Sequence, residues 1–370
     1  IETLTYDADG QVLSRTDAEG RVTTSHWNAL GQEIRRDLPE VPAGPRALVF
    51  TYSVHGELLS ETDANEYTTT HRYDGLGRRV YTQLPDDTER TAQFDAVGNQ
   101  TASTDAAGFT TSFTYDGLNR RVTQVDPEPL TTQQAWTYDR AGNVLTHTDR
   151  RGLVTRSTYD GENRLLTLHR DGVRRQTLAY DAVGNVVTET DANGEQSTHV
   201  YDAGNRRIRT LRPLQYETSW TYTPWGAVET ATDADGFVTQ RSYDVRQRLA
   251  SETDAAGNTT TYGYDGVGNR VRLTRPLEID WTFTFDAGDR LIEVRSPEDA
   301  LTAYGYDRHG NRTTLTDAGG QLTTWVYDRR HRVEQTLHPD DHEERFAYDA
   351  ESRLRERTDG NGARTEVEVD

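Results

Sequence analysis

The chain has 370 residues, a net charge of −20 and only 33% hydrophobic residues. This charge argues against nucleic acid or anionic membrane as the main partner, because both need a basic face, and no run approaches the roughly 20 apolar residues that span a bilayer. No cysteine is present, which excludes disulfides, thiolate metal sites and cysteine nucleophiles. The composition alone borders on that of disordered chains, so the fold must be read from the order of the residues.

An aromatic anchor recurs from one end of the chain to the other. It appears 17 times, and 14 of the 16 intervals are 21 residues; the others are 25 and 23. A fixed period of this kind is typical of repeat architectures. We therefore expect one array over residues 1–370 and not the several domains that length alone suggests. The anchors are Tyr6, Trp27, Tyr52, Tyr73, Phe94, Tyr115, Tyr138, Tyr159, Tyr180, Tyr201, Tyr222, Tyr243, Tyr264, Phe285, Tyr306, Tyr327 and Tyr348.

Strands are predicted on both sides of each anchor. Before it, large and small side chains alternate, as in residues 112–115 and 280–285, and a period of two is typical of a strand. The residue two before the anchor is often aromatic, as at Phe113, Trp136 and Trp220, and lies on the anchor's face. Stacked repeats should therefore form two neighbouring ladders of large side chains, about two strands a repeat and no long helix.

A turn follows each anchor. The next residue is Asp in 14 of 17 copies, and four after the anchor comes Gly in ten copies and Asn in three. An Asp that accepts backbone N–H bonds opens a type I turn, and Gly or Asn in the left-handed region closes it. Gln247, Asp289, His331 and Ser352 break this rule, so we expect looser or differently built turns there. Clear examples are Tyr73-Asp74-Gly77, Tyr138-Asp139-Gly142, Tyr180-Asp181-Gly184, Tyr264-Asp265-Gly268 and Tyr306-Asp307-Gly310.

A second turn ends the return strand of each repeat. One kind reads Thr-Asp-x-x-Gly, as at Asp191, and the other carries Pro, as at Pro85 or Pro339. The two kinds alternate strictly as far as Tyr222. Both long intervals have their extra residues at Pro-type turns, in segments 38–45 and 126–130, so insertions are expected at one edge of the ribbon.

The motif Tyr-Asp-x-x-Gly-Asn/Arg at a spacing of 21 resembles the YD repeats of the Rhs family, which includes bacterial polymorphic toxins, the C component of Tc toxins, WapA-like wall proteins and animal teneurins. The resemblance covers the whole chain. It implies an all-β fold of tandem YD/RHS β-hairpin repeats that form a long spiralling β-sheet, part of a hollow shell around a C-terminal toxin. It also implies a secreted or cell-surface protein, carried by secretion or toxin-delivery machinery.

The chain departs from the family at its usual end. There the family has an Asp-Pro-x-Gly-Leu motif whose aspartate cleaves the toxin from the shell, whereas the one Asp-Pro here, Asp126-Pro127, is followed by Glu128 and Pro129. Neither the autoprotease core nor a toxin domain is found, and no catalytic site can be singled out. Because the chain starts at Ile1 and contains no Met, we interpret it as a piece of a longer protein.

Two groups of residues invite a metal interpretation. The Asp-rich turns at residues 7–10 and 233–236 suggest calcium, but Phe237 stands where an EF-hand needs a ligand, and turn chemistry accounts for these aspartates. The weak metal candidates are His338, Asp340, His342 and Glu343, in a Pro-type turn. A pair of His at i and i+4 binds metal on a helix, but this segment lies at a turn between strands. An exposed acidic hairpin is therefore favoured here, and no cofactor is expected.

Two further features concern binding. Trp225 lies in a turn where most copies have a small or aliphatic residue, and an exposed Trp can stack on a sugar or on a partner side chain; the alternative is that it folds over the neighbouring turn. The basic cluster at residues 329–332 is expected to be neutralised by acidic neighbours. The favoured function is a structural shell fragment that shields and delivers toxin cargo, without enzyme activity. The alternative is a module that binds glycans or a cell-surface protein.

The distribution of apolar residues predicts a sheet without a packed centre. Large side chains occupy only a handful of the 21 positions in a repeat, and Thr, Arg, Asp, Glu and Gln fill the remainder. A solid core needs apolar residues along most inward positions. Stability should therefore come from stacking of neighbouring repeats, and an enclosed or partly enclosed space filled with solvent or cargo should remain.

Overall fold

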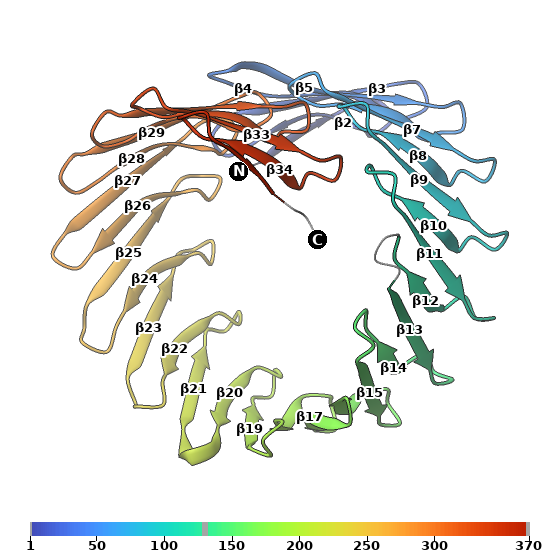
Figure 1. Cartoon of the computed structure of the whole chain (residues 1–370). Helices are drawn as coiled ribbons and strands as arrows, with labels where there is room; N and C mark the ends of the chain where they lie inside the picture. The colour runs from blue at the N-terminus through green and yellow to red at the C-terminus, as the bar shows by residue number, and fades with distance from the viewer. Residues whose placement is uncertain (1, 128–131, 368–370) are drawn as a thin grey trace. The chain divides into compact units, whose positions relative to one another are not determined.

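Figure 1 shows the computed structural model of the chain, which describes residues 2–127 and 132–367. These residues form one sheet of 35 strands and one short 3₁₀ turn, Pro213–Gln215. Paired strands are antiparallel and adjacent in sequence, as in β1 with β2 and β2 with β3. The expected all-β array is confirmed, with about two strands a repeat. Among the described residues no helix is long and apolar enough to cross a membrane.

The first strands are β1 (Thr3–Tyr6), β2 (Val12–Thr16), β3 (Val22–Trp27), β4 (Glu33–Val41), β5 (Gly44–Tyr52), β6 (Leu58–Thr62), β7 (Thr68–Tyr73), β8 (Arg79–Gln83), β9 (Glu89–Phe94), β10 (Gln100–Thr104), β11 (Thr110–Tyr115) and β12 (Arg121–Val125). They continue as β13 (Gln133–Tyr138), β14 (Val144–Thr148), β15 (Val154–Tyr159), β16 (Leu165–Arg170), β17 (Val173–Tyr180), β18 (Val186–Thr190), β19 (Gln196–Tyr201), β20 (Arg207–Leu211), β21 (Glu217–Tyr222), β22 (Val228–Thr232), β23 (Val238–Tyr243) and β24 (Leu249–Thr253). The last are β25 (Thr259–Tyr264), β26 (Arg270–Arg275), β27 (Ile279–Phe285), β28 (Leu291–Arg295), β29 (Leu301–Tyr306), β30 (Arg312–Thr316), β31 (Leu322–Tyr327), β32 (Val333–Leu337), β33 (Glu343–Tyr348), β34 (Leu354–Thr358) and β35 (Arg364–Glu366).

The array divides into two units. The first comprises residues 1–93, 103–109 and 262–370, and the second residues 94–102 and 110–261. The first unit thus combines the beginning and the end of the chain, whose strands lie near one another in Figure 1. Repeats of the same kind run through both units.

Both hairpin turns of a repeat share one backbone geometry. In the first turn, which follows the anchor, Asp181 N donates to Asn185 O (3.0 Å) and Gly184 N donates to Asp181 O (3.2 Å). The second turn at Asp191 repeats this pattern, and so does the Pro-type turn that opens at Leu84 (Leu84 N to Thr88 O, 2.8 Å). Since successive hairpins alternate, first turns line one edge of the sheet and second turns line the other. Of the insertions, segment 38–45 lengthens the β4–β5 hairpin, whereas residues 128–130 lie outside the described residues.

The aspartate of the first turn fixes that geometry, as the motif predicted. Asp181 Oδ1 accepts the amides of Val183 (3.0 Å) and Asn185 (2.9 Å), and Oδ2 accepts Asn185 Nδ2 (2.9 Å). The hydrogen bond from Asn185 holds the pKa of Asp181 below its ordinary value, so the ionised form stabilises the turn at neutral pH. Gly184 has φ +100°, the left-handed region that the code requires.

The expectation of looser turns at the four exceptions was wrong. Gln247, Asp289, His331 and Ser352 have φ of +64°, +58°, +61° and +66°, and each donates its amide to the carbonyl of the first turn residue. At Asp289 and His331 the reason is a second use of this position. Where the preceding repeat ends its turn in Asn, that amide reaches the side chain of the next repeat, as from Asn185 to Asn205 Oδ1 (3.0 Å) or from Asn269 to Asp289 Oδ1 (2.7 Å). A polar residue is therefore retained in place of Gly.

Further bonds couple each repeat to the next. The anchor hydroxyl donates to a backbone carbonyl of the preceding repeat, as from Tyr180 to Leu165 O (2.8 Å). Arg164, bound to Asp160 Oδ2 (2.7 Å), also donates to Asp181 O (3.1 Å) and lies over the Tyr180 ring at 4.7 Å. Most anchors make the first of these contacts. In about every second repeat an arginine makes the other two, so the stacked turns form continuous polar ladders.

The aromatic ladder two residues before the anchors is also present, interleaved with arginine. Arg121 lies 5.7 Å from the Phe113 ring and 4.5 Å from the Trp136 ring, and Arg312 lies 4.6 Å from the Trp325 ring. Among the described residues, Val41 and Ala64 are the only buried hydrophobic ones, and no large side chain is fully buried. The prediction of a sheet without a packed apolar centre is confirmed for the described part of the chain.

The shared positive φ gives a direct mutational test. Gly184→Val should lower the free energy of unfolding by about 1–3 kcal/mol, because a β-branched residue is strained in the left-handed region. No atom lies within 4 Å of the position of an added Cβ, so a clash contributes nothing. Ser352→Val should cost a similar amount, and not much less as its sequence suggests. Ala182→Val, at an exposed position of the same turn, is the control in urea denaturation; equal effects of all three changes would contradict the account.

Candidate functional site

The most elaborate cluster of polar side chains lies in the first unit, where late first turns meet early second turns. We call this the junction: turns 265–269, 286–290, 307–311, 328–332 and 349–353 on one side, and turns 17–21, 63–67, 84–88 and 105–109 with Arg46 on the other. The bonded partners are 242 to 268 residues apart in the chain. Figure 1 shows part of this contact, where β29 and β33 lie near β4 and β5.

Charged pairs make up much of the junction. Arg21 Nη2 donates to Asp289 Oδ1 (2.9 Å) and Arg90 Nη2 to Glu351 Oε2 (3.0 Å). Glu351 also accepts the amide of Ala106. In both pairs an arginine of the early repeats binds a carboxylate of a late first turn.

The basic cluster at residues 329–332 belongs to this junction. Arg330 Nη1 lies 3.1 Å from Asp86 Oδ2, and Arg332 Nη2 lies 3.5 Å from the same oxygen. The pKa of Asp86 is held below its ordinary value: burial opposes the shift, but hydrogen bonds from Thr88 and Arg330 outweigh it. The expectation that acidic neighbours neutralise the cluster is confirmed.

Backbone groups add specificity to the contact. Asn65 uses both ends of its amide: Nδ2 donates to Asp307 Oδ2 (2.9 Å), and Oδ1 accepts the amide of His309 (3.1 Å). Arg46 Nε donates to Arg308 O (2.8 Å), a carbonyl at the tip of the same turn. Such bonds depend on register, so the two stretches of chain meet in one alignment.

A cavity of about 480 Å³ lies at the junction. Its walls include Phe50 and Thr69 from the early strands, Pro85 from a second turn, and His309 and His331 from late first turns. Asp63 also lines it, and its carboxylate lies 2.7 Å from His331 Nε2 and 3.4 Å from His309 Nδ1. Apolar and charged side chains are mixed around this space.

Asp63, His309 and His331 form a three-residue group whose ligand atoms lie within 4.8 Å of one another. The two imidazoles are stacked, with centroids 3.8 Å apart and planes inclined by 8°. An imidazole binds a metal along a lone pair in its own plane, so two parallel rings cannot direct both lone pairs at one ion. Sequence reasoning missed this group because its members come from repeats more than 240 residues apart.

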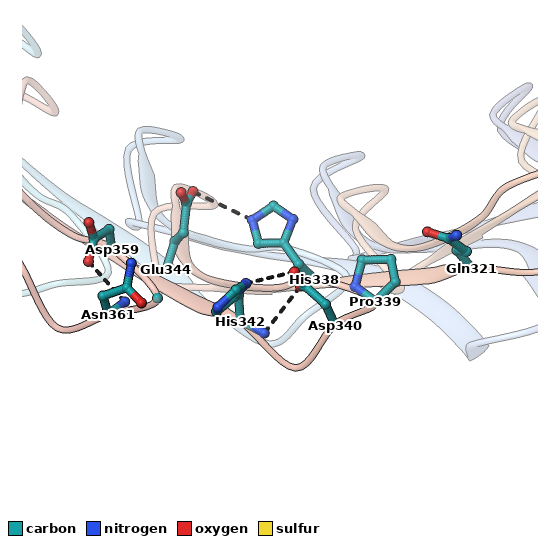
Figure 2. A pocket seen from close by; sticks show the side chains of 9 residues that line it. Gln321, His338, Pro339, Asp340, His342, Glu344, Asp359 and Asn361 are labelled. Carbon is teal, nitrogen blue, oxygen red and sulfur yellow. Dashed lines mark hydrogen bonds and ion pairs between the residues drawn. The ribbon is translucent and has the colours of Figure 1, made fainter.

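The predicted metal candidates lie elsewhere, at a second-turn edge of the first unit. Figure 2 shows a cavity of about 470 Å³ lined by His338, Asp340, His342 and Glu344. His342 Nδ1 bonds Asp340 Oδ2 at 2.7 Å, whereas His338 Nε2 faces Glu344 Oε2 at 3.7 Å. Glu343 instead pairs with Arg345. Each candidate thus has its own partner, and the four do not converge on one point.

The remaining candidates are turn residues. The anchors Tyr73, Tyr138 and Tyr306 donate to backbone carbonyls, and Asp74 and Asp139 accept from the fifth residue of their own turns. Trp225 lies in the turn that opens at Thr223, with half of its surface exposed (52%).

Comparison with known proteins places these repeats in a family. The model of the Teneurin YD-shell matches residues 167–365, and the RHS repeat model matches residues 6–40, 52–88, 94–131 and 138–175. No curated protein sequence matches the chain.

Solved structures share the fold. The chain is similar to TcdB2-TccC3 without its hypervariable C-terminal region (TM-score 0.71, 16% identity, 97% of this chain and 26% of that chain). It is also similar to TcdB2-TccC3-TEV (TM-score 0.70, 16% identity, 97% and 26%) and to a Photorhabdus luminescens Tc holotoxin pore (TM-score 0.65, 17% identity, 97% and 25%). It spans about a quarter of the length of these chains. With its motif, strand pattern and family match in agreement, the chain belongs to the YD-shell family of RHS-repeat proteins.

Proposed function

We propose that the chain is part of the wall of a shell that shields a C-terminal toxin polypeptide of its parent protein. The observation that carries this proposal is the sheet without a packed apolar centre, held together by contacts between neighbouring repeats. A wall of this kind needs no material inside it for stability, so the enclosed space remains available to cargo.

The polar character of the sheet supports the same role. A polypeptide held unfolded exposes apolar side chains, and large apolar patches on the wall would bind them. Here the large side chains of the ladders are half-buried by one another and by arginine, as Trp136 is by Arg121. In this proposal the partners are the toxin cargo and a secretion or delivery machine, and the parent protein acts outside the cell that makes it.

Small-angle X-ray scattering tests the shell. A solid globule of this length has a radius of gyration of roughly 21 Å, and we expect a larger value together with a pair-distance distribution that has a maximum shifted to long distances. The reason is that the mass lies in a sheet and not around a centre. A radius at or below that of the solid globule would contradict the proposal.

A second candidate function rests on Trp225. Its half-exposed ring lies at a turn tip, where it can stack on a sugar or on a side chain of a surface protein. If the module binds glycans, the chain should bind specific members of a glycan array, and Trp225→Ala should abolish the signal. Leu118→Ala is a matched control, because Leu118 occupies the same turn position and is also exposed. Absence of binding by the unmodified chain would dismiss this candidate.

A further inference from the structure

The stacked histidines of the junction join two stretches of chain that are far apart in sequence. His309 is the third residue of turn 307–311, and His331 is the fourth residue of turn 328–332. Both face Asp63, the first residue of turn 63–67, over 2.7 Å for His331 Nε2 and 3.4 Å for His309 Nδ1. Whatever changes the charge of these rings therefore acts on the contact between early and late repeats.

Hydrogen bonding fixes the tautomer of His331. Asn311 Nδ2 donates to Asp307 Oδ2 (2.7 Å) and also faces His331 Nδ1 (2.9 Å), so this ring nitrogen is an acceptor. The hydrogen is then on Nε2, which donates to Asp63 Oδ2 (2.7 Å). A second proton, on Nδ1, would point at the hydrogens of the Asn311 amide and break this arrangement.

His309 binds a proton less readily than a free imidazole does. Burial lowers its pKa most, and the adjacent His331 lowers it further, against the opposing effects of Asp63 and Asp307. Arg46, from the early strands, adds a further positive charge nearby. With ring centroids 3.8 Å apart, two imidazolium ions would be held at contact distance.

Other charged groups surround the pair. The early turns contribute Glu66, which pairs with Arg308, and Asp86, which pairs with Arg330. Tyr67 lies against the His331 ring (5.6 Å), and Glu61, Arg90 and Arg329 line the same cavity. Arginine stays charged at all relevant pH values, and carboxylates ordinarily titrate below about pH 5. The histidine pair is therefore the part of this contact suited to respond between about pH 7 and 5.

We propose that Asp63, His309 and His331 form an acid-released latch, which holds early and late repeats together when both imidazoles are neutral and lets them separate when the pair takes up protons. The sign follows from linkage. His309 binds a proton more weakly in the closed junction than in an open one, so the closed form loses stability as pH falls below the ordinary histidine value of about 6.5. The inference concerns this chain alone, and it does not depend on whether the parent protein encloses cargo.

The test measures the separation of early and late strands directly. The chain has no cysteine, so Glu40→Cys and Val326→Cys, both exposed and outside the junction, give unique sites for two spin labels. At pH 8 we expect one narrow distance distribution. At pH 5.5 a broader population at longer distance should appear, and its ratio to the closed population should rise by up to about tenfold, because pH 5.5 lies about one unit below the ordinary histidine pKa. Far-UV circular dichroism should remain that of a β-sheet.

Matched variants separate charge from structure. His331→Asn keeps the acceptor for Asn311, because Asn119, Asn163 and Asn205 occupy the same turn position and accept the same bond. Combined with His309→Gln, it should leave the junction closed at both pH values. His55→Gln, in a first turn outside the junction, should respond to pH as the unmodified chain does. The latch is excluded if the unmodified chain does not open at pH 5.5, if the double variant still opens on acidification, or if the double variant is open at both pH values.

Discussion

The fold depends on one short oxygen-bearing side chain in each repeat, an aspartate in 14 of 17 copies, that accepts the backbone amides of its own turn. Asp181 binds two amides and one side chain, and equivalent bonds recur at Asp74, Asp160, Asp202 and Asp244. A five-residue turn fixed in this way sets the register of the hairpin, and the register determines which side chains share a face. Because the turns recur at a constant interval, each hairpin presents its ladder residues to the next in the same position.

The stabilising contacts consequently join neighbouring repeats along the ribbon. The arginine at the end of one turn binds the carbonyl and covers the ring of the next repeat, as Arg164 does with Asp181 and Tyr180. Exposed ion pairs of this type contribute little singly, but here each guanidinium also binds a carbonyl and covers an aromatic ring. A sheet built in this manner can curve without a centre, and this property is what a shell requires. The aspartate bonds do not fix which side chains occupy the tips of the turns. In the junction these tips carry the charged and aromatic side chains that join early and late repeats.

Much of this was predictable from the sequence because the interactions are local. Period-two alternation and the Asp-x-x-Gly spacing gave the strands and turns, and the scarcity of large side chains gave the absence of a packed centre. The tolerance of His331 and Ser352 at the left-handed position was not foreseen, although the alternation of Gly-Asn with a polar residue before Arg is visible along the chain. This pattern cannot be derived from one turn alone, because the bond that selects the polar residue comes from the preceding repeat.

The junction could not be predicted in this way. Contacts such as Asp63 with His331 join turns whose bonded residues are 268 positions apart, and no local pattern in the sequence states which distant repeats meet. The expectation for His338 and His342 came from chain proximity, yet the turn directs the two rings to different carboxylates. Asp63, His309 and His331, which are distant in sequence, converge more closely than His338 and His342, which are close in sequence.

The central claim is that stability resides in contacts between adjacent repeats and not in a common core. Native-state hydrogen exchange of the chain with Asp181→Ala tests it most directly. We expect faster amide exchange in turn 181–185 and in the neighbouring turns 160–164 and 202–206, with unchanged rates in turn 328–332, because the lost bonds act on nearest neighbours. A uniform increase over the whole sheet, as in a protein that unfolds around one core, would contradict the claim.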